Sequence, residues 1–186
     1  MNHLEIRLSG SGGQGLQLSA RILAEAFVAE GAYVAQSQSY EPTSRGGMSR
    51  SDLVVDGHTP EYPLATALDV LLILDECAAG ASDALLGPEA LVLADADKVR
   101  TRPDGNTCRL HVLPLVRTAR DLGNIRVANI VALGAMNGLA GLFPAEALEA
   151  AVRAGAPARF LDLNLEALAA GYKLAGGGQD AAASAG

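Results

Sequence analysis

The chain has 186 residues, a mass of 19.0 kDa and 49% hydrophobic residues, which predicts one globular domain with a packed core and excludes disorder for most of its length. The formal net charge of -7 and the pI near 4.9 argue against a dedicated nucleic-acid binder or a protein of anionic membrane surfaces. The N-terminal sequence has neither a cationic segment nor a long apolar run, and no apolar run reaches the ~20 residues of a membrane span. We therefore expect a cytoplasmic chain that has no membrane span.

Cysteine content limits the chemistry that the chain can hold. Its two cysteines, Cys77 and Cys108, cannot build a disulfide framework. They form no Cys-x-x-Cys pair of the kind that ligates zinc or an iron-sulfur cluster. We predict no metal site in this chain, so a redox metal would have to be held elsewhere.

The chain opens with a strand, a glycine-rich turn and a helix. Alternation of apolar and polar residues predicts a strand over Leu4–Leu8, and Gly10–Gly15 follows it directly as a turn. Apolar residues then recur at helical spacing from Gln14 to Glu30, with Gly31 in the position of a C-cap glycine.

A second short strand is predicted over Ala32–Gln36, followed by a polar loop over Ser37–Gly47. Met48–Val55 has the pattern of a strand. The tight-turn pair Asp56-Gly57 and a short return over His58–Tyr62 then predict a β-hairpin.

The continuous apolar run Val70–Leu74 indicates a strand covered on both faces, as in parallel sheets flanked by helices. Two further strands are predicted over Ala90–Ala94 and Leu110–Leu113. Helical patterns follow over Leu115–Leu122, Val127–Leu139, Pro144–Val152 and Leu161–Leu174.

This alternation predicts an α/β fold: an open, mostly parallel, Rossmann-like sheet with helices on both faces and a β-hairpin excursion. Residues 1–174 form the single predicted domain. Residues 175–186 are rich in glycine and alanine and too poor in large apolar groups to pack, so we predict a disordered tail there.

Gly10, Gly12 and Gly15 match G-x-G-x-x-G between a strand and a helix, where backbone amides and the positive helix end can approach a phosphate. A nicotinamide dinucleotide site would also need an acidic residue at the end of the second strand, and Tyr33–Gln38 supplies none. The alternative interpretation is that the glycines only permit a sharp turn and close helix packing.

A second candidate loop, Ser37–Gly47, follows the next predicted strand and should lie at the same carboxyl-terminal edge of the sheet. Arg45 is suited to a phosphate or carboxylate, and Gly46-Gly47 allows a backbone path that side chains would forbid. A surface turn with a solvated arginine is the alternative interpretation.

No nucleophile lies beside a base in either loop, and we predict no catalytic residue. Asp75-Glu76 could provide acid-base chemistry, but capping of the next helix is the favoured interpretation. Asn129 and Asn137 lie in a predicted helix of small residues and could hydrogen-bond a ligand or a neighbouring chain, although core packing explains that helix equally well.

The sequence resembles the gamma subunit of the 2-oxoacid:acceptor oxidoreductases, a family that acts on pyruvate, 2-oxoglutarate, 2-ketoisovalerate, indolepyruvate and phenylglyoxylate. The similarity covers about Leu4 to Leu174. It depends on ordered motifs at Gly10–Gly15, Ser39–Gly47, Arg126–Asn129, Leu133–Ala135 and Asn164–Tyr172.

The resemblance implies oxidative decarboxylation of a 2-oxoacid with coenzyme A (CoA), giving an acyl-CoA, CO2 and two electrons for ferredoxin or another acceptor. It places thiamine diphosphate and Mg2+ between alpha and beta subunits and [4Fe-4S] clusters on an iron-sulfur subunit or ferredoxin, so this chain would bind none of these alone. The gamma subunit would cover the active site and help hold CoA. The residues expected to contact it are Gly10, Ser11, Gly12, Gly13, Gln14, Gly15, Ser39, Tyr40, Arg45, Gly46, Gly47 and Asn129.

This sequence departs from the family at one motif. Many relatives have Gly-Pro-Glu after the tyrosine, whereas Tyr40 is followed here by Glu41-Pro42-Thr43, so the carboxylate is displaced and the 2-oxoacid stays open. Two other hypotheses for the function remain. The chain could be an independent Rossmann-type NAD(P) oxidoreductase, or a non-catalytic scaffold whose glycine loops pack against partner subunits.

Overall fold

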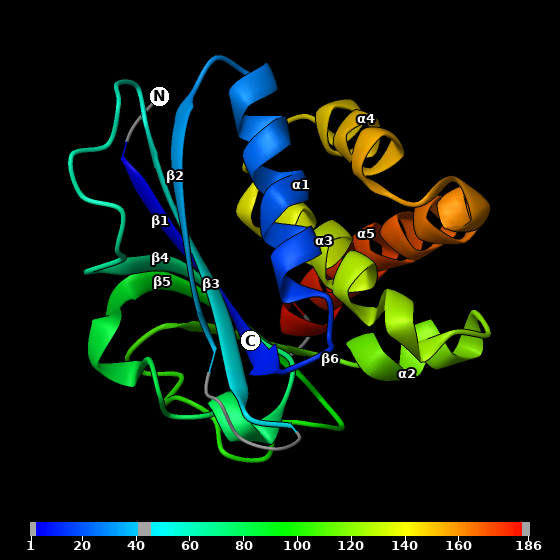
Figure 1. The fold of residues 1–186 in the computed structure, drawn as a ribbon. Coiled ribbons are helices and arrows are strands. Elements are labelled where there is room, and N and C mark those ends of the chain that lie inside the picture. The colour runs from blue at the N-terminus through cyan, green and yellow to red at the C-terminus, as the bar shows by residue number, and fades with distance from the viewer. Residues whose placement is uncertain (1–2, 41–45, 184–186) are drawn as a thin grey trace.

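The computed structural model describes residues 3–40 and 46–183, with side chains described as far as residue 176. These residues form a six-stranded sheet and five α-helices (Figure 1). The strands are β1 (Leu4–Ser11), β2 (Tyr33–Tyr40), β3 (Met48–Asp56), β4 (Leu68–Ile73), β5 (Leu86–Asp95) and β6 (Arg109–Leu113). The helices are α1 (Leu16–Ala29), α2 (Leu115–Asp121), α3 (Ala128–Ala140), α4 (Ala145–Gly155) and α5 (Leu161–Ala183).

The strand order is β2-β3-β1-β4-β5-β6. Strands β1, β4, β5 and β6 pair in parallel, and β3 runs antiparallel to both β1 and β2. Because β2 and β1 are both antiparallel to β3, they point in the same direction. The predicted open, mostly parallel α/β sheet is confirmed, and β3 alone of the described strands runs against the others.

The helix arrangement differs from the prediction of helices on both faces. Residues of all five α-helices join one core cluster with one face of the sheet, and Figure 1 shows α1, α3, α4 and α5 on that side. The opposite face, with Leu71, Ile73 and Val92, is covered by short 3-10 turns and loops, including buried Val99 and Cys108. The connections from β4 to β5 and from β5 to β6 contain 3-10 turns or loops and no α-helix.

The predicted hairpin after β3 is wrong, since residues 57–62 form no strand. Strand β3 instead lies between β2 and β1, which explains why Leu53, Val54 and Val55 are all nearly inaccessible to solvent. The antiparallel hairpin is β2–β3. Strand β2 runs to Tyr40, so Ser37–Tyr40 are strand residues and not the start of a loop.

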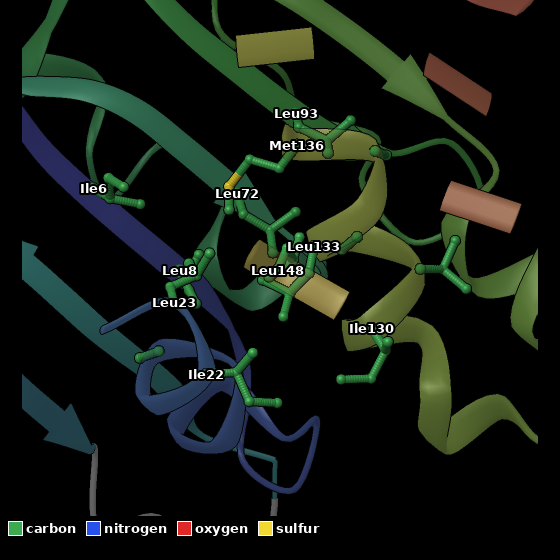
Figure 2. Packing of buried hydrophobic residues seen from close by; sticks show 14 of the residues in the cluster. Ile6, Leu8, Ile22, Leu23, Leu72, Leu93, Ile130, Leu133, Met136 and Leu148 are labelled. Atoms are coloured by element: carbon green, nitrogen blue, oxygen red, sulfur yellow. The ribbon is translucent and has the colours of Figure 1, made fainter. Parts of the chain in front are cut away.

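The main core lies between the helices and the sheet (Figure 2). Ile6 and Leu8 alternate with polar residues along β1 and point to this side, where they pack against α1. Phe27 of α1 and Phe143 meet edge to face, with ring centroids 4.9 Å apart. These contacts hold α1 against the helix face of the sheet.

Helix α5 was predicted to end at Leu174 but continues to Ala183, into the segment expected as a tail. Alanine has the highest helix propensity, and extending a helix that is already packed costs little. Disorder of the last residues, 184–186, stays a prediction because they lie outside the described residues.

Candidate functional site

The glycine turn lies at the carboxyl end of β1, in the centre of the sheet, and leads into α1. Gly13 and Gly15 have φ values of 92° and 75°, in the left-handed region that favours glycine. Gly15 is the N-cap residue of α1, no side chain caps the helix, and its first turn contains no acidic residue. The first amides of a 14-residue helix are thus available at this edge.

Gln14 folds back and closes the turn. The amide of Ser11 donates to Oε1 of Gln14 at 2.7 Å, and Nε2 of Gln14 donates to the carbonyl of Leu74 at 3.2 Å. A Cβ at Gly10 would lie 2.2 Å from the same Oε1, so a side chain there would displace the Gln14 amide group. Gln14 therefore joins the turn to the end of β4, and the backbone amides of Ser11 and Gln14 are used within the protein.

The second predicted loop meets the glycine turn. The amide of Gly12 donates to the carbonyl of Gly47 at 3.0 Å, and a Cβ on Gly12 would come within 3.0 Å of the Tyr40 ring. In the sheet register, Ser49 of β3 lies between Gly10 and Tyr40. The predicted convergence of the two loops is confirmed for these residues. Arg45 lies outside the described residues, as do 41–44.

A cavity of about 300 Å³ opens between the turn and the β2–β3 hairpin. The cavity extends from the first backbone amides of α1 to the ring of Tyr40. Its lining consists of Ser11, Gly12, Gly13, Gln14, Gly15, Leu16, Gln17, Tyr40 and Ser49. Most of this lining is backbone and uncharged polar groups, which suits an anion bound by amides and the helix dipole.

Asn129 supports the turn from the core side. It is 3% exposed, and its Nδ2 donates to the carbonyl of Gly15 at 3.3 Å and to Oγ of Ser19 at 3.0 Å. A Cβ at Gly15 would lie 2.7 Å from this Nδ2. Asn129 thus acts on the site through the backbone of Gly15.

A second cavity, of about 240 Å³, lies on the other side of the glycine turn. The residues that sequence reasoning missed as a group are here, because they come from β4, from the loop after β5 and from the segment before α3. The lining is Ser11, Gly13, Gln14, Leu74, Asp75, Lys98, Val116, Ile125, Arg126 and Ala128. Asp75 caps the following 3-10 turn through the amide of Cys77, as favoured from the sequence.

The histidines lie away from this edge or outside both cavities. His3 and His58, distant in sequence, line one cavity at the opposite edge of the sheet, and His111 lies in β6. Hydrogen bonds with Asp56 and then Glu5 raise the pKa of His3, whereas burial and then Arg109 lower the pKa of His111.

The described side chains offer no cluster of ligands for a divalent metal ion or an iron-sulfur cluster. Across residues 3–40 and 46–183, no group of three or more His, Cys, Asp or Glu side chains could hold a metal ion. Cys77 is exposed beyond β4, while Cys108 is buried before β6. None of the helices in the described part of the chain is both long and apolar enough to cross a membrane.

A Rossmann dinucleotide site is also a poor fit. The strand that follows α1 would have to lie beside β1 and place an acidic residue at its end. In this fold β3 separates β2 from β1, and β2 carries no acidic residue between Tyr33 and Tyr40. The geometry leaves the glycine turn without the ribose contact that a dinucleotide needs.

The described residues thus form an open α/β domain with a glycine turn at the carboxyl edge of its sheet. The family model described as pyruvate ferredoxin/flavodoxin oxidoreductase matches residues 5–174, and the chain belongs to this family. Within it, the chain is a gamma subunit of the 2-oxoacid ferredoxin oxidoreductases, which are multi-subunit oxidoreductase complexes.

Individual relatives agree with this assignment. The 2-oxoglutarate synthase subunit KorC of Archaeoglobus fulgidus is 36% identical over 142 residues, which covers 76% of this chain and 73% of that protein. The keto/oxoacid ferredoxin oxidoreductase gamma subunit of Geobacter sulfurreducens has a TM-score of 0.84 and 39% identity, covering 96% of this chain and 99% of that one.

A third comparison extends the likeness of fold to a longer chain. The 2-oxoglutarate:ferredoxin oxidoreductase of Magnetococcus marinus, solved with 2-oxoglutarate, coenzyme A and succinyl-CoA bound, has a TM-score of 0.83. The likeness covers 95% of this chain but 32% of that one, at 22% identity.

Proposed function

We propose that this gamma subunit covers the active site of its complex and holds CoA while a 2-oxoacid is oxidatively decarboxylated. The products are an acyl-CoA, CO2 and two electrons for ferredoxin or another acceptor. Thiamine diphosphate and Mg2+ belong to the alpha and beta subunits and [4Fe-4S] clusters to an iron-sulfur subunit or ferredoxin. The chain alone is inactive.

The observation that carries the CoA proposal is the cavity between the glycine turn and the β2–β3 hairpin. CoA is a long polyanion, and the uncapped start of α1 offers amides and a positive dipole end to a phosphate. Gly13 has nothing within 4 Å of where its Cβ would stand, so a ligand can approach the backbone closely.

The residues of the site act by binding and orienting. Gln14 and Asn129 hold the turn in its left-handed path, and Tyr40 supplies an aromatic surface over Gly12. Arg45, from the connection between β2 and β3, would add a bidentate cation for a phosphate. None of these groups needs to exchange a proton with the substrate.

The test is the CoA dependence of activity in the assembled complex, measured as 2-oxoacid-dependent reduction of a viologen dye. Arg45→Ala should raise the KM for CoA about tenfold, the loss of one charge-assisted contact, and leave kcat at saturating CoA nearly unchanged. Arg153→Ala is the matched control, because Arg153 is a half-exposed arginine on α4 paired with Glu149. An unchanged KM in Arg45→Ala would overturn the CoA role.

For the 2-oxoacid itself we propose 2-oxoglutarate. The support is the name of the A. fulgidus relative, a 2-oxoglutarate synthase subunit. The same dye assay with a panel of 2-oxoacids tests this proposal. A higher kcat/KM for 2-oxoglutarate than for pyruvate or 2-ketoisovalerate supports it, and the reverse order contradicts it.

A further inference from the structure

The second cavity lies where the chain leaves the neighbouring strands β1 and β4 toward opposite faces of the sheet. The chain leaving β1 turns to the helix face and enters α1, whereas the chain leaving β4 turns to the opposite face and enters the 3-10 turn Glu76–Ala78. Ligands of open α/β sheets bind in the crevice that such a divergence leaves at the carboxyl ends of parallel strands. Leu74 and Gln14, on the two sides of this crevice, both line the cavity.

Two cations line this cavity without partners. Within the described part of the chain, neither Lys98 nor Arg126 uses its side chain in a hydrogen bond or an ion pair, and both are exposed. By contrast, the arginines of β1 and of α2, Arg7 and Arg117, pair with Asp52 and Asp97. Two unpaired cations thus line one cavity of a chain whose formal net charge is -7.

The negative charges that face the cavity do not neutralise it. Asp75 is the acidic residue in the lining, and its carboxylate accepts a hydrogen bond from the amide of Cys77 at 3.3 Å. Asp97, next to Lys98 in sequence, is paired with Arg117. Two cations against one carboxylate leave the lining net positive.

The two cavities are neighbours. Ser11, Gly13 and Gln14 line both, so only the glycine turn separates the amide-lined cavity from the cationic one. A ligand with two anionic groups a few bonds apart can therefore reach both sides of the turn. CoA is such a ligand, because one ribose carries the 3'-phosphate and, through its 5'-carbon, the diphosphate.

We propose that the cavity lined by Lys98 and Arg126 is the subsite for the 3'-phosphate of CoA, with the diphosphate held at the start of α1. The inference rests on the proposed function and adds residues to it. A phosphate monoester is close to doubly charged at neutral pH, which matches two cationic side chains. Arg126 offers the planar fork that binds phosphate through two hydrogen bonds, and Lys98 a point charge.

The test compares CoA with dephospho-CoA, which lacks the 3'-phosphate, in the assembled complex. Lys98→Met and Arg126→Met should each raise the KM for CoA about tenfold and leave the KM for dephospho-CoA unchanged. Lys98→Arg, which keeps the charge, should retain most of the CoA affinity. Lys173→Met is the matched control, an exposed lysine of α5 outside both cavities.

Each other result separates this inference from the function on which it rests. If Arg45→Ala raises the KM for CoA but the Lys98 and Arg126 variants do not, the subsite is wrong and the CoA role stands. If no variant changes the KM, both fall. If the Met variants abolish co-purification of the partner subunits, or weaken CoA and dephospho-CoA equally, the cations dock an acidic partner segment and the 3'-phosphate subsite is overturned.

Discussion

A single side chain, Gln14, decides the shape of the glycine turn. It satisfies the Ser11 amide and the Leu74 carbonyl with the two ends of one amide group. Without it, both backbone groups would need other partners at the centre of the sheet edge, and an unmade hydrogen bond of this kind costs about 1–3 kcal/mol. Gln14 is therefore a positioning residue for whatever the turn binds.

Gln14→Ala should lower the free energy of unfolding by about 1–3 kcal/mol and, in the complex, raise the KM for CoA with little change in kcat. Gln36→Ala is the control, since Gln36 is an exposed glutamine of β2 that lines neither of the two cavities. Thermal denaturation and steady-state kinetics measure the two effects. If the Gln14→Ala variant loses stability but keeps the KM for CoA, Gln14 has only a structural role.

At the residue scale, the glycines could be predicted because their motif follows a strand pattern directly, and Tyr40 because it belongs to a motif that carries the family resemblance. Sequence reasoning could not find the pair Lys98 and Arg126, which are 28 positions apart in the printed sequence and meet only through the order of the strands. For Asn129, the sequence indicated a polar group in a small-residue helix. Its target, the Gly15 carbonyl, depends on how α3 packs on α1.

At the scale of elements, the close approach of α3 and α5 explains the run of small residues in α3. A Cβ on Gly134 would lie 2.2 Å from the carbonyl oxygen of Leu168, and one on Gly171 would lie 2.1 Å from that of Val131. These neighbours are backbone atoms and cannot rotate away. Neither glycine is needed for a left-handed turn, so both are packing glycines.

Gly171→Ala should therefore destabilise the chain by about 1–3 kcal/mol through overpacking. Gly176→Ala, in the same helix but with open space around the new Cβ, should stabilise it by about 0.5–1 kcal/mol because alanine favours the helix. Chemical denaturation of both variants measures the contrast. Equal effects of the two substitutions would contradict the close α3–α5 contact.

The elements predicted best were those with a continuous or periodic apolar pattern. Val70–Leu74 was found because burial on both faces leaves an unbroken apolar run, and β4 ends within one residue of it. The end of β2 was missed because Ser37–Ser39 are polar. An edge strand exposes its residues on both sides, so its sequence resembles that of a loop.

At the scale of the molecule, the two edges of the sheet have separate tasks. The site lies at the carboxyl edge, while at the opposite edge His3 joins Asp56 at 3.0 Å and Glu5 at 3.2 Å. Glu5 also accepts hydrogen bonds from Thr66 and Ala67, which hold the loop before β4. Changes at that edge should alter stability and leave CoA kinetics unaffected.

The titration of this cluster predicts how stability depends on pH. The hydrogen bond to Asp56 raises the pKa of His3 above 6.5 and lowers the pKa of Asp56. The contribution of the His3 imidazole to folding stability is complete below pH 6.5 and is lost as pH rises through the raised pKa. The contribution of the Asp56 carboxylate is lost as pH falls through its lowered pKa.

His3→Gln should therefore remove the alkaline loss of stability, whereas His58→Gln should keep it. The melting temperature of the isolated chain, followed from mildly acidic to mildly alkaline pH, checks this. A wild-type melting temperature that increases as pH rises above 6.5 would contradict this prediction.

The strands themselves could be predicted from the sequence, but their order in the sheet could not. The local pattern identified β3 as a strand and its Asp56-Gly57 end as a turn, but not its partners. Insertion of β3 between β1 and β2 depends on pairing between distant segments, which no local pattern encodes.

Attachment of the β2–β3 hairpin to the rest of the sheet through β1 alone has a consequence for the connection between its two strands. Residues can be inserted or deleted between Tyr40 and Gly46 without shifting the register of the parallel strands that hold the core. A change of length in this connection would therefore alter the rim of the cavity beside Tyr40 and leave the core strands in register. Glu41 of this chain lies in that connection.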